Sequence, residues 1–145
     1  MTADRIQRIR DSFDLVAPRA GELMDTFYGL LFERYPSVRP LFPSDMSKQK
    51  QHLTAAVALV VKHAGNLAAL EPALMEMGAR HVGYGAKPEH YPLVGATMLD
   101  ALERVAGPAW NATLREDWGW ALNAVAAAMV KGAESAGNGS RKMAA

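Results

Sequence analysis

Three polar side chains, Tyr28, Gln49 and His81, lie on helical stripes that are otherwise apolar. Around His81 the sequence reads MEMGARHVGYG, so Gly78 precedes the histidine by three residues and Gly85 follows it by four. Residues three and four apart share one face of a helix. Because glycine in a helix interior costs about 1 kcal/mol relative to alanine, the two glycines indicate space cleared beside His81 for a flat, wide neighbour.

Each of these residues, taken alone, has an ordinary structural role. A tyrosine on an apolar face usually belongs to the core, and a lone histidine is usually a satisfied or surface group. Together they lie on three expected helices that can face one interior. Imidazole is a common metal ligand, and polar groups facing it across an apolar cleft would suit a small polar ligand held on a metal. The combination suggests haem with His81 as its axial ligand.

Signatures of other chemistries are missing from the sequence. It has no His-Glu-x-x-His zinc pair, no Glu-x-x-His pair of the di-iron type, and no nucleophile elbow, phosphate loop or dinucleotide-binding glycine motif. It has no cysteine, which excludes disulfides, thiolate metal sites and iron–sulfur clusters. His63 is expected at a helix end and His90 at a helix start, where both would be solvated.

The composition is that of an ordinary globular protein, with 145 residues, 50% hydrophobic and 21% charged. The formal net charge of +1 and the lack of a basic stripe give no electrostatic support for nucleic acid binding. No apolar run is long enough to span a membrane, and the N-terminus lacks an apolar signal-peptide core. We expect a cytoplasmic protein with a single domain over residues 1–145.

The apolar spacing is helical nearly throughout, and no segment alternates with the period of two that a strand requires. The sequence predicts an all-α fold of six main helices plus a short helix at the proline-rich corner YPSVRPLFP. Ser44 or Ser47 is expected to cap the helix after this corner. Gly85 should end the helix that carries His81, Pro88 should open the next one, and residues 136–145 should form a flexible tail. The stripes expected to face the core are Ile6, Ile9, Phe13 and Val16; Leu23, Phe27 and Leu30; Gln49, Leu53, Val57 and Val60; Leu74; Tyr91, Val94, Met98, Leu102 and Val105; and Leu114, Trp118, Ala121, Val125 and Met129.

The sequence resembles globins, and most of all the single-domain bacterial globins of the Vitreoscilla haemoglobin type and the haem domain of flavohaemoglobins. The matching stretches are TFYGLLFERYPSVRPLF, GARHVGYG followed closely by HYPLVG, and DWGWA near the end. The resemblance runs from about residue 5 to about residue 132, judged by motif order. It implies the globin fold, with three-over-three helix packing around haem b.

On the distal side of the haem, the resemblance assigns a role to five residues. Tyr28 matches the tyrosine that faces bound ligand, and Gln49 falls at the distal helix position that also faces it. Phe42 matches the phenylalanine that packs on the haem, and Leu53 falls at the apolar position above it. His52 falls where the family often places a basic group near a propionate; a small rotation of its helix could instead bring its imidazole to the iron.

On the proximal side, the resemblance makes His81 the iron ligand and places Tyr91 beside it. Flavohaemoglobins add a late glutamate that polarises the proximal histidine. The matching position here is Ala133, and Glu134 lies one residue on, about 100° round a helix. A carboxylate partner raises the basicity of a ligating imidazole, so the departure implies at most weak peroxidase-like activity.

The resemblance implies reversible binding of dioxygen, carbon monoxide and nitric oxide through a histidine-ligated haem iron. The alternative is an enzyme, a nitric oxide dioxygenase that works with a separate reductase, because the 145 residues hold no reductase domain. A third possibility is a haem-free helical sensor or interaction module. The family includes monomers and homodimers, so either state is compatible with the sequence.

Overall fold

The computed structural model describes residues 2–144, with side chains described for residues 3–135. Six α-helices account for most of this part of the chain, and it contains no strand. The predicted all-α fold with six main helices is therefore confirmed. Their bounds are α1 (Thr2–Val16), α2 (Ala20–Arg34), α3 (Ser47–Lys62), α4 (Glu71–Gly83), α5 (His90–Ala106) and α6 (Ala112–Ala144). The short 3-10 helices between them are η1 (Ala17–Arg19), η2 (Pro36–Leu41), η3 (Leu67–Leu70) and η4 (Gly107–Ala109).

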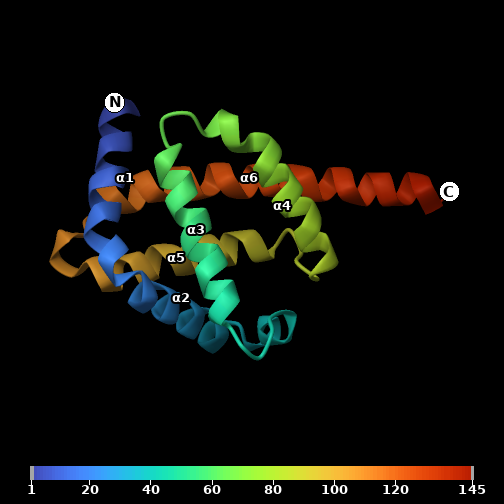
Figure 1. Cartoon of the computed structure of the whole chain (residues 1–145), viewed down its shortest axis with the longest axis horizontal. Helices are drawn as coiled ribbons and strands as arrows, with labels where there is room; N and C mark the ends of the chain where they lie inside the picture. The colour runs from blue at the N-terminus through green and yellow to red at the C-terminus, as the bar shows by residue number, and fades with distance from the viewer. Residues whose placement is uncertain (1, 145) are drawn as a thin grey trace.

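The six helices cross in two sets. Figure 1 shows α1, α3 and α4 crossing over α2, α5 and α6, which is the predicted three-over-three arrangement. The predicted corner helix is η2, between α2 and α3, and its two prolines keep it short. The predicted flexible tail covers residues 136–145. The side chains of these residues, and the whole of Ala145, lie outside the described part of the chain. The backbone of α6 is helical as far as Ala144, and it extends past the other helices (Figure 1).

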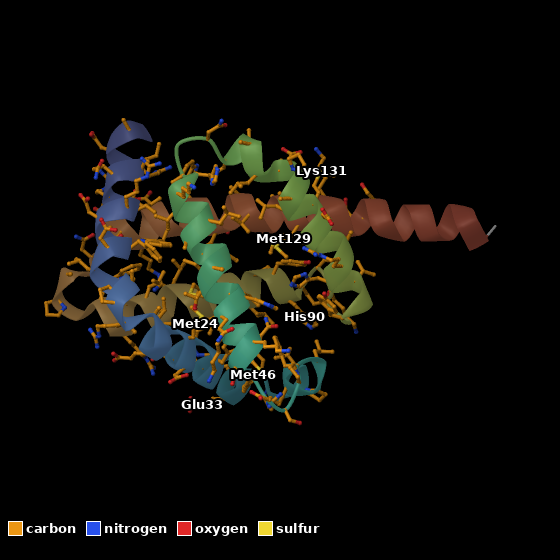
Figure 2. The ribbon with its side chains drawn as sticks, in the orientation of Figure 1. Met24, Glu33, Met46, His90, Met129 and Lys131 are labelled. Carbon is orange, nitrogen blue, oxygen red and sulfur yellow. The ribbon has the colours of Figure 1, made fainter. Side chains whose placement is uncertain are left out.

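The core is built from the stripes that the sequence predicted. Trp118 is 1% exposed and lies in one cluster with residues from all six α-helices. Met24 of α2 and Met129 of α6 are among these buried side chains (Figure 2). Fully burying such a side chain is worth about 1.5–3 kcal/mol, so the shared apolar cluster holds the helices together. Val94, predicted to face the core, is instead 38% exposed.

Two buried or half-buried carboxylates tie the helices together. Asp117 of α6 is 1% exposed and accepts hydrogen bonds from Arg8 at 2.6 and 3.0 Å and from Arg5 at 3.2 Å, which joins α6 to α1. Asp100 of α5 accepts from Arg34 of α2 at 2.7 Å and from Arg115 of α6 at 3.0 Å. These contacts fix α6, which passes behind α4 in Figure 1, and α5, which passes behind α3.

The helix that carries His81 stops at Gly85 as predicted. The last helical residue of α4 is Gly83, and Gly85 follows Tyr84 with a φ of 90°, the left-handed conformation that ends many helices. The Gly85 N–H donates to the Val82 carbonyl at 3.1 Å and the Ala86 N–H to the His81 carbonyl at 3.0 Å, which closes the helix end. α5 begins at His90, later than predicted, and Pro88 lies in the preceding turn, where its carbonyl accepts the Tyr91 N–H at 3.3 Å.

The predicted serine cap of α3 is wrong, because Met46 occupies the N-cap and makes no side-chain hydrogen bond there. Just before it, Asp45 Oδ1 accepts the Ser47 N–H at 2.9 Å. This hydrogen bond from the Ser47 backbone lowers the pKa of the Asp45 carboxyl below its ordinary value. A carboxylate at a helix start also interacts favourably with the helix dipole. Asp45 therefore orients the first turn of α3, which carries Gln49.

None of the helices in the described residues has both the length and the apolar character that crossing a membrane requires.

Candidate haem site

The structure brings Tyr28 and Gln49 together between α2 and α3. Tyr28 is 4% exposed, and its hydroxyl oxygen accepts a hydrogen bond from Gln49 Nε2 at 3.1 Å. Burial raises the pKa of the Tyr28 hydroxyl above its ordinary value, and the hydrogen bond from Gln49 offsets part of that rise. The phenol therefore keeps its proton at neutral pH. Because the amide nitrogen can only donate, the Tyr28 proton is left available for another acceptor.

Phe42 lies beside this polar pair, at the end of η2. Its ring centroid is 5.8 Å from that of Tyr28 and 5.3 Å from that of Phe32, both in edge-to-face geometry. Arg39 holds the corner in place, since its guanidinium donates to the carbonyls of Phe42 at 3.3 Å and Pro43 at 3.0 Å. These aromatic contacts help to bury the Tyr28 ring.

Leu53 and His52 differ in their surroundings although they are neighbours on α3. Leu53 is half-buried, packs against the core and lies one turn after Gln49, so the two share a helix face. His52 is exposed. The structure thus brings Leu53 into the group of predicted site residues and leaves His52 at the surface.

His81 is half-buried on the last turn of α4. Its Nδ1 lies 2.6 Å from the carbonyl oxygen of Met77, one turn earlier. A carbonyl oxygen only accepts, so Nδ1 must carry a proton, and in the neutral imidazole Nε2 then has a free lone pair. Metal-ligating histidines commonly donate their other ring N–H in this way. The Tyr84 ring packs edge-to-face on the imidazole at a centroid distance of 5.3 Å, and no pattern in the sequence predicts this contact.

The prediction that Gly78 clears space for a flat ligand is wrong. A Cβ at Gly78 would overlap the carbonyl oxygen of Met129, so the cleared space is filled by the backbone of α6. A Cβ at Gly85 would lie 2.9 Å from Leu41 Cδ2, which brings the turn after α4 against η2. Both glycines allow close packing of protein on protein, which sequence spacing cannot distinguish from room for a ligand.

Tyr91 is the remaining predicted site residue, at the start of α5. Its ring is half-buried against the core, while its hydroxyl oxygen is buried and finds no hydrogen-bond partner among the described residues. Burial raises the pKa of this hydroxyl above its ordinary value. A buried polar group without a partner costs about 1–3 kcal/mol. Such an atom is expected where a bound group or a water completes a site. Tyr91 and Glu134 line the same hollow between α5 and α6.

The donors present fit haem better than a metal ion bound by protein alone. Among the described residues, no three His, Cys, Asp or Glu side chains come together as a metal site. A single histidine with a free Nε2 fits an iron whose other ligands come from a porphyrin. Tyr28 and Gln49 supply polar groups, and Phe42 and Leu53 supply apolar ones. The residues present therefore fit a haem group.

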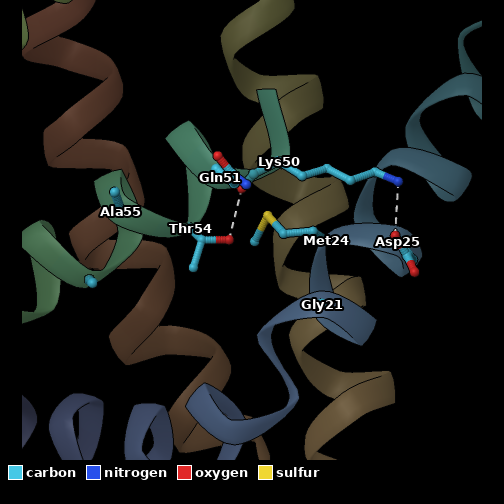
Figure 3. A pocket seen from close by; sticks show the side chains of 8 residues that line it. Gly21, Met24, Asp25, Lys50, Gln51, Thr54 and Ala55 are labelled. Atoms are coloured by element: carbon cyan, nitrogen blue, oxygen red, sulfur yellow. Dashed lines mark hydrogen bonds and ion pairs between the residues drawn. The ribbon is translucent and has the colours of Figure 1, made fainter. Parts of the chain in front are cut away.

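A separate hollow lies between α2 and α3, and Figure 3 shows it from close by. Its volume is about 380 Å³, and it contains none of the predicted site residues. Three of its polar side chains are already paired: Lys50 Nζ lies 2.9 Å from Asp25 Oδ1, and Thr54 Oγ1 donates to the Lys50 carbonyl at 2.8 Å. Met24 lies between the two helices here (Figure 3). The hollow offers mainly apolar contact, and no motif in the sequence pointed to it.

Comparison with known proteins agrees with this description. Residues 25–129 match the Globin family. A flavohemoprotein of Bacillus cereus is 32% identical over 133 residues, which are 90% of this chain and 33% of that protein. A globin-like protein of Aquifex aeolicus is 31% identical over 108 residues, 74% of this chain and 78% of the relative. The chain spans about a third of the length of the flavohemoproteins it matches.

Two solved structures share the fold over nearly the whole chain. A bacterial globin from Campylobacter jejuni has a TM-score of 0.82 and 27% identity, covering 92% of this chain and 97% of its own. An engineered carbene transferase, derived from a candidate nitric oxide dioxygenase of Rhodothermus marinus, has a TM-score of 0.81 and 28% identity, covering 97% of this chain and 96% of its own. The chain therefore belongs to the globin family.

Proposed function

We propose that this globin binds dioxygen, carbon monoxide and nitric oxide reversibly at a haem iron that His81 ligates. Globins and flavohemoproteins bind haem, so haem is the cofactor of this chain. The observation that carries the proposal is the His81 Nδ1 hydrogen bond to the Met77 carbonyl, because it leaves Nε2 free to bind iron. Haem, when bound, supplies an iron that can bind a diatomic gas and exchange an electron.

Each predicted site residue would have its own role around the haem. His81 holds the cofactor from the α4 side. Tyr28 donates a hydrogen bond to a polar ligand, and Gln49 fixes the direction of the hydroxyl proton by donating to a lone pair on the phenol oxygen. Phe42 and Leu53 exclude water, which strengthens the hydrogen bond from Tyr28 in the pocket. We expect His52 near a propionate and Tyr91 behind His81.

A second candidate function is nitric oxide dioxygenation, in which nitric oxide, dioxygen and one electron give nitrate. The Rhodothermus marinus relative favours it, because its name includes that activity. The same proton donor on Tyr28 would serve. The electron would come from an external reductase, which is the partner that this function requires.

One experiment separates these functions. The haem-loaded protein is reduced, exposed to oxygen and mixed with nitric oxide, with and without a flavin reductase and NADH, while the spectrum and nitrate are followed. Reversible oxygen uptake without sustained nitrate formation supports the gas-binding role. Continued nitrate formation that depends on the reductase supports the enzyme. A purified protein that has no haem absorbance and takes up no added haem would overturn both and favour the haem-free module.

Four further expectations, on location, domain number, assembly and peroxidase-like activity, are proposals in the same way. We infer that the chain works in the cytoplasm as one domain and assembles as a monomer or homodimer, which cell fractionation and sedimentation measure. Peroxidase-like activity should be weak, because Ala133 offers no carboxylate to Tyr91. If Glu134 supplied that carboxylate from its place in the same hollow, Glu134→Gln would lower the peroxidase rate.

A further inference from the structure

Helices α4 and α6 touch backbone to backbone at two glycines, Gly78 and Gly132. An ideal Cβ at Gly78 would overlap the Met129 carbonyl oxygen and lie 2.7 Å from the Met129 Cα. A Cβ at Gly132 would overlap the Met75 carbonyl oxygen and lie 2.5 Å from the Met75 Cα. Real Cβ atoms essentially never come within 3.0 Å of another heavy atom in this way. No side chain therefore separates the two helices at this point.

The crossing is reciprocal. Met75 precedes Gly78 by three residues, and Met129 precedes Gly132 by three, so each glycine rests on the carbonyl one turn before its partner glycine. Close contacts between glycine Cα–H groups and carbonyl oxygens recur at helix interfaces. A carbonyl cannot move aside by changing rotamer, so this contact fixes the separation of the helices more rigidly than side chains would.

The position of α4 depends on this crossing. α4 packs mainly on α6, and Figure 2 places Met129 and Lys131 of α6 beside it. An ion pair between Lys131 and Glu71, at 2.8 Å, holds the start of α4 to the same helix. α6 is itself anchored to α1 through Asp117 and through Trp118, whose indole N–H donates to Ser12 at 2.9 Å. α6 is thus the fixed support on which α4 rests.

We propose that Gly78 and Gly132 are positioning residues for His81: their contact sets how far the imidazole reaches into the haem pocket. His81 follows Gly78 by three residues, so the two side-chain directions differ by only about 60° round the helix. Pushing α4 away from α6 at Gly78 therefore draws the His81 ring back. The inference rests on the proposed function, in which His81 binds the iron.

The test inserts one methyl group at the crossing, in Gly78→Ala and Gly132→Ala. In the reduced, gas-free haem protein, resonance Raman spectroscopy reports the stretching frequency of the bond between iron and His81. We expect this frequency to fall in both variants. Transfer of haem to an excess of apomyoglobin should be roughly tenfold faster, which corresponds to about 1.4 kcal/mol of lost haem binding.

Gly119→Ala is the matched control, because it makes the same change on α6 away from the crossing. A Cβ at Gly119 would meet only Leu99 Cδ1, at 4.0 Å, which is ordinary contact. The Raman frequency and the haem transfer rate of this variant should equal those of the wild type. A loss of haem in Gly119→Ala as large as in Gly132→Ala would show a general effect of substituting α6 and would overturn the proposal.

The proposal would also be overturned if Gly78→Ala and Gly132→Ala both had the wild-type iron–histidine stretching frequency and the wild-type rate of haem transfer. If the variants do not fold, the helix crossing can still be tested in the wild-type haem protein. The crossing requires a nuclear Overhauser contact between the α-protons of Gly78 and Met129. The absence of this contact would refute the geometry on which the proposal rests. A failure of the proposed function looks different. In that case the iron–histidine band is missing from the wild type itself, while the contact between the α-protons is present.

Discussion

The Tyr28 hydroxyl has a proton to offer a ligand because Gln49 occupies one of its lone pairs from the other side. A hydrogen bond to a polarised partner is worth about 1.5–3 kcal/mol, and each 1.4 kcal/mol is about tenfold in a rate. Tyr28→Phe should therefore speed oxygen release by roughly ten- to a hundredfold, measured by stopped-flow displacement. Carbon monoxide, which is less polarised when bound, should leave at nearly its wild-type rate.

Two companion variants make the Tyr28 result specific. Gln49→Leu should speed oxygen release less than Tyr28→Phe does, because it only frees the phenol to rotate. Tyr35→Phe removes a hydroxyl just past the end of the same helix and should change nothing. An oxygen release rate within twofold of the wild type in Tyr28→Phe would place the hydroxyl out of the ligand's reach.

His81 is the one residue whose removal should abolish cofactor binding. We expect His81→Gly to lose most of its haem and to regain it when imidazole is added, since imidazole can fill the vacated space. His63→Gly is the matched control: His63 Nδ1 makes the same kind of contact, 3.0 Å from the carbonyl oxygen of Leu59, but this hydrogen bond is exposed and lies at the end of α3. Haem titration followed by absorbance measures both. Full haem retention with an unchanged spectrum in His81→Gly would refute the ligand assignment.

At the residue scale, the sequence predicted the polar side chains of the candidate site better than the role of the glycines between them. Tyr28 and Gln49 were expected to face one interior, and they are hydrogen-bonded, because each lies on the apolar stripe of its own helix. Gly78 was misread because its neighbour on α6 is about fifty residues away in the chain, and helical periodicity carries no information about such a partner. Tyr84 lies beyond the last turn of α4, where the periodic pattern ends.

At the scale of elements, the existence of each helix followed from its apolar period, whereas its ends followed only in part. A helix end is decided by one or two backbone dihedrals and by one capping oxygen. Gly85 stops α4 with a positive φ, as predicted, but no serine caps α3, and α5 begins after Pro88 rather than at it. Several turn-forming residues stood near each end in the sequence, and only the path of the chain selects among them.

The junction of α1 with α6 depends on one carboxylate. Asp117 is buried while Arg5 and Arg8 are partly exposed, so removing the negative charge leaves cations that water can still reach. Asp117→Asn should lower the free energy of unfolding by about 1.5–3 kcal/mol, the range for a hydrogen bond to a charged group. Denaturant titration at pH 7 measures this loss. Asp25→Asn, in the exposed ion pair with Lys50, is the control and should cost at most about 1 kcal/mol; an equal loss in both variants would contradict the special role of Asp117.

At the scale of the whole molecule, the ion pairs join helices that are far apart in the sequence, so they should govern acid stability together. The hydrogen bond from Arg8 lowers the pKa of the Asp117 carboxyl below its ordinary value. Burial tends to raise the pKa of Asp100, but hydrogen bonds from Arg34 and Arg115 outweigh it, and the net shift is also downward. Both carboxylates therefore hold their protons less tightly in the folded protein than in the unfolded chain.

The direction of the pH effect follows from these two shifts. An unfolded aspartate titrates near pKa 3.9, so the stabilisation is fully present above about pH 5 and is lost as the pH falls through the lower pKa of each folded carboxyl. We expect the free energy of unfolding of the haem-loaded protein to change little from pH 7 to about pH 5 and to fall below that. The double variant Asp100→Asn, Asp117→Asn should be less stable at pH 7 and should lose less of its remaining stability on acidification. Denaturant midpoints across this pH range measure both, and because both proteins carry haem, acid release of the cofactor affects them alike. If the free energy of unfolding fell equally steeply below pH 5 in the wild type and in the double variant, other carboxylates would control the acid response.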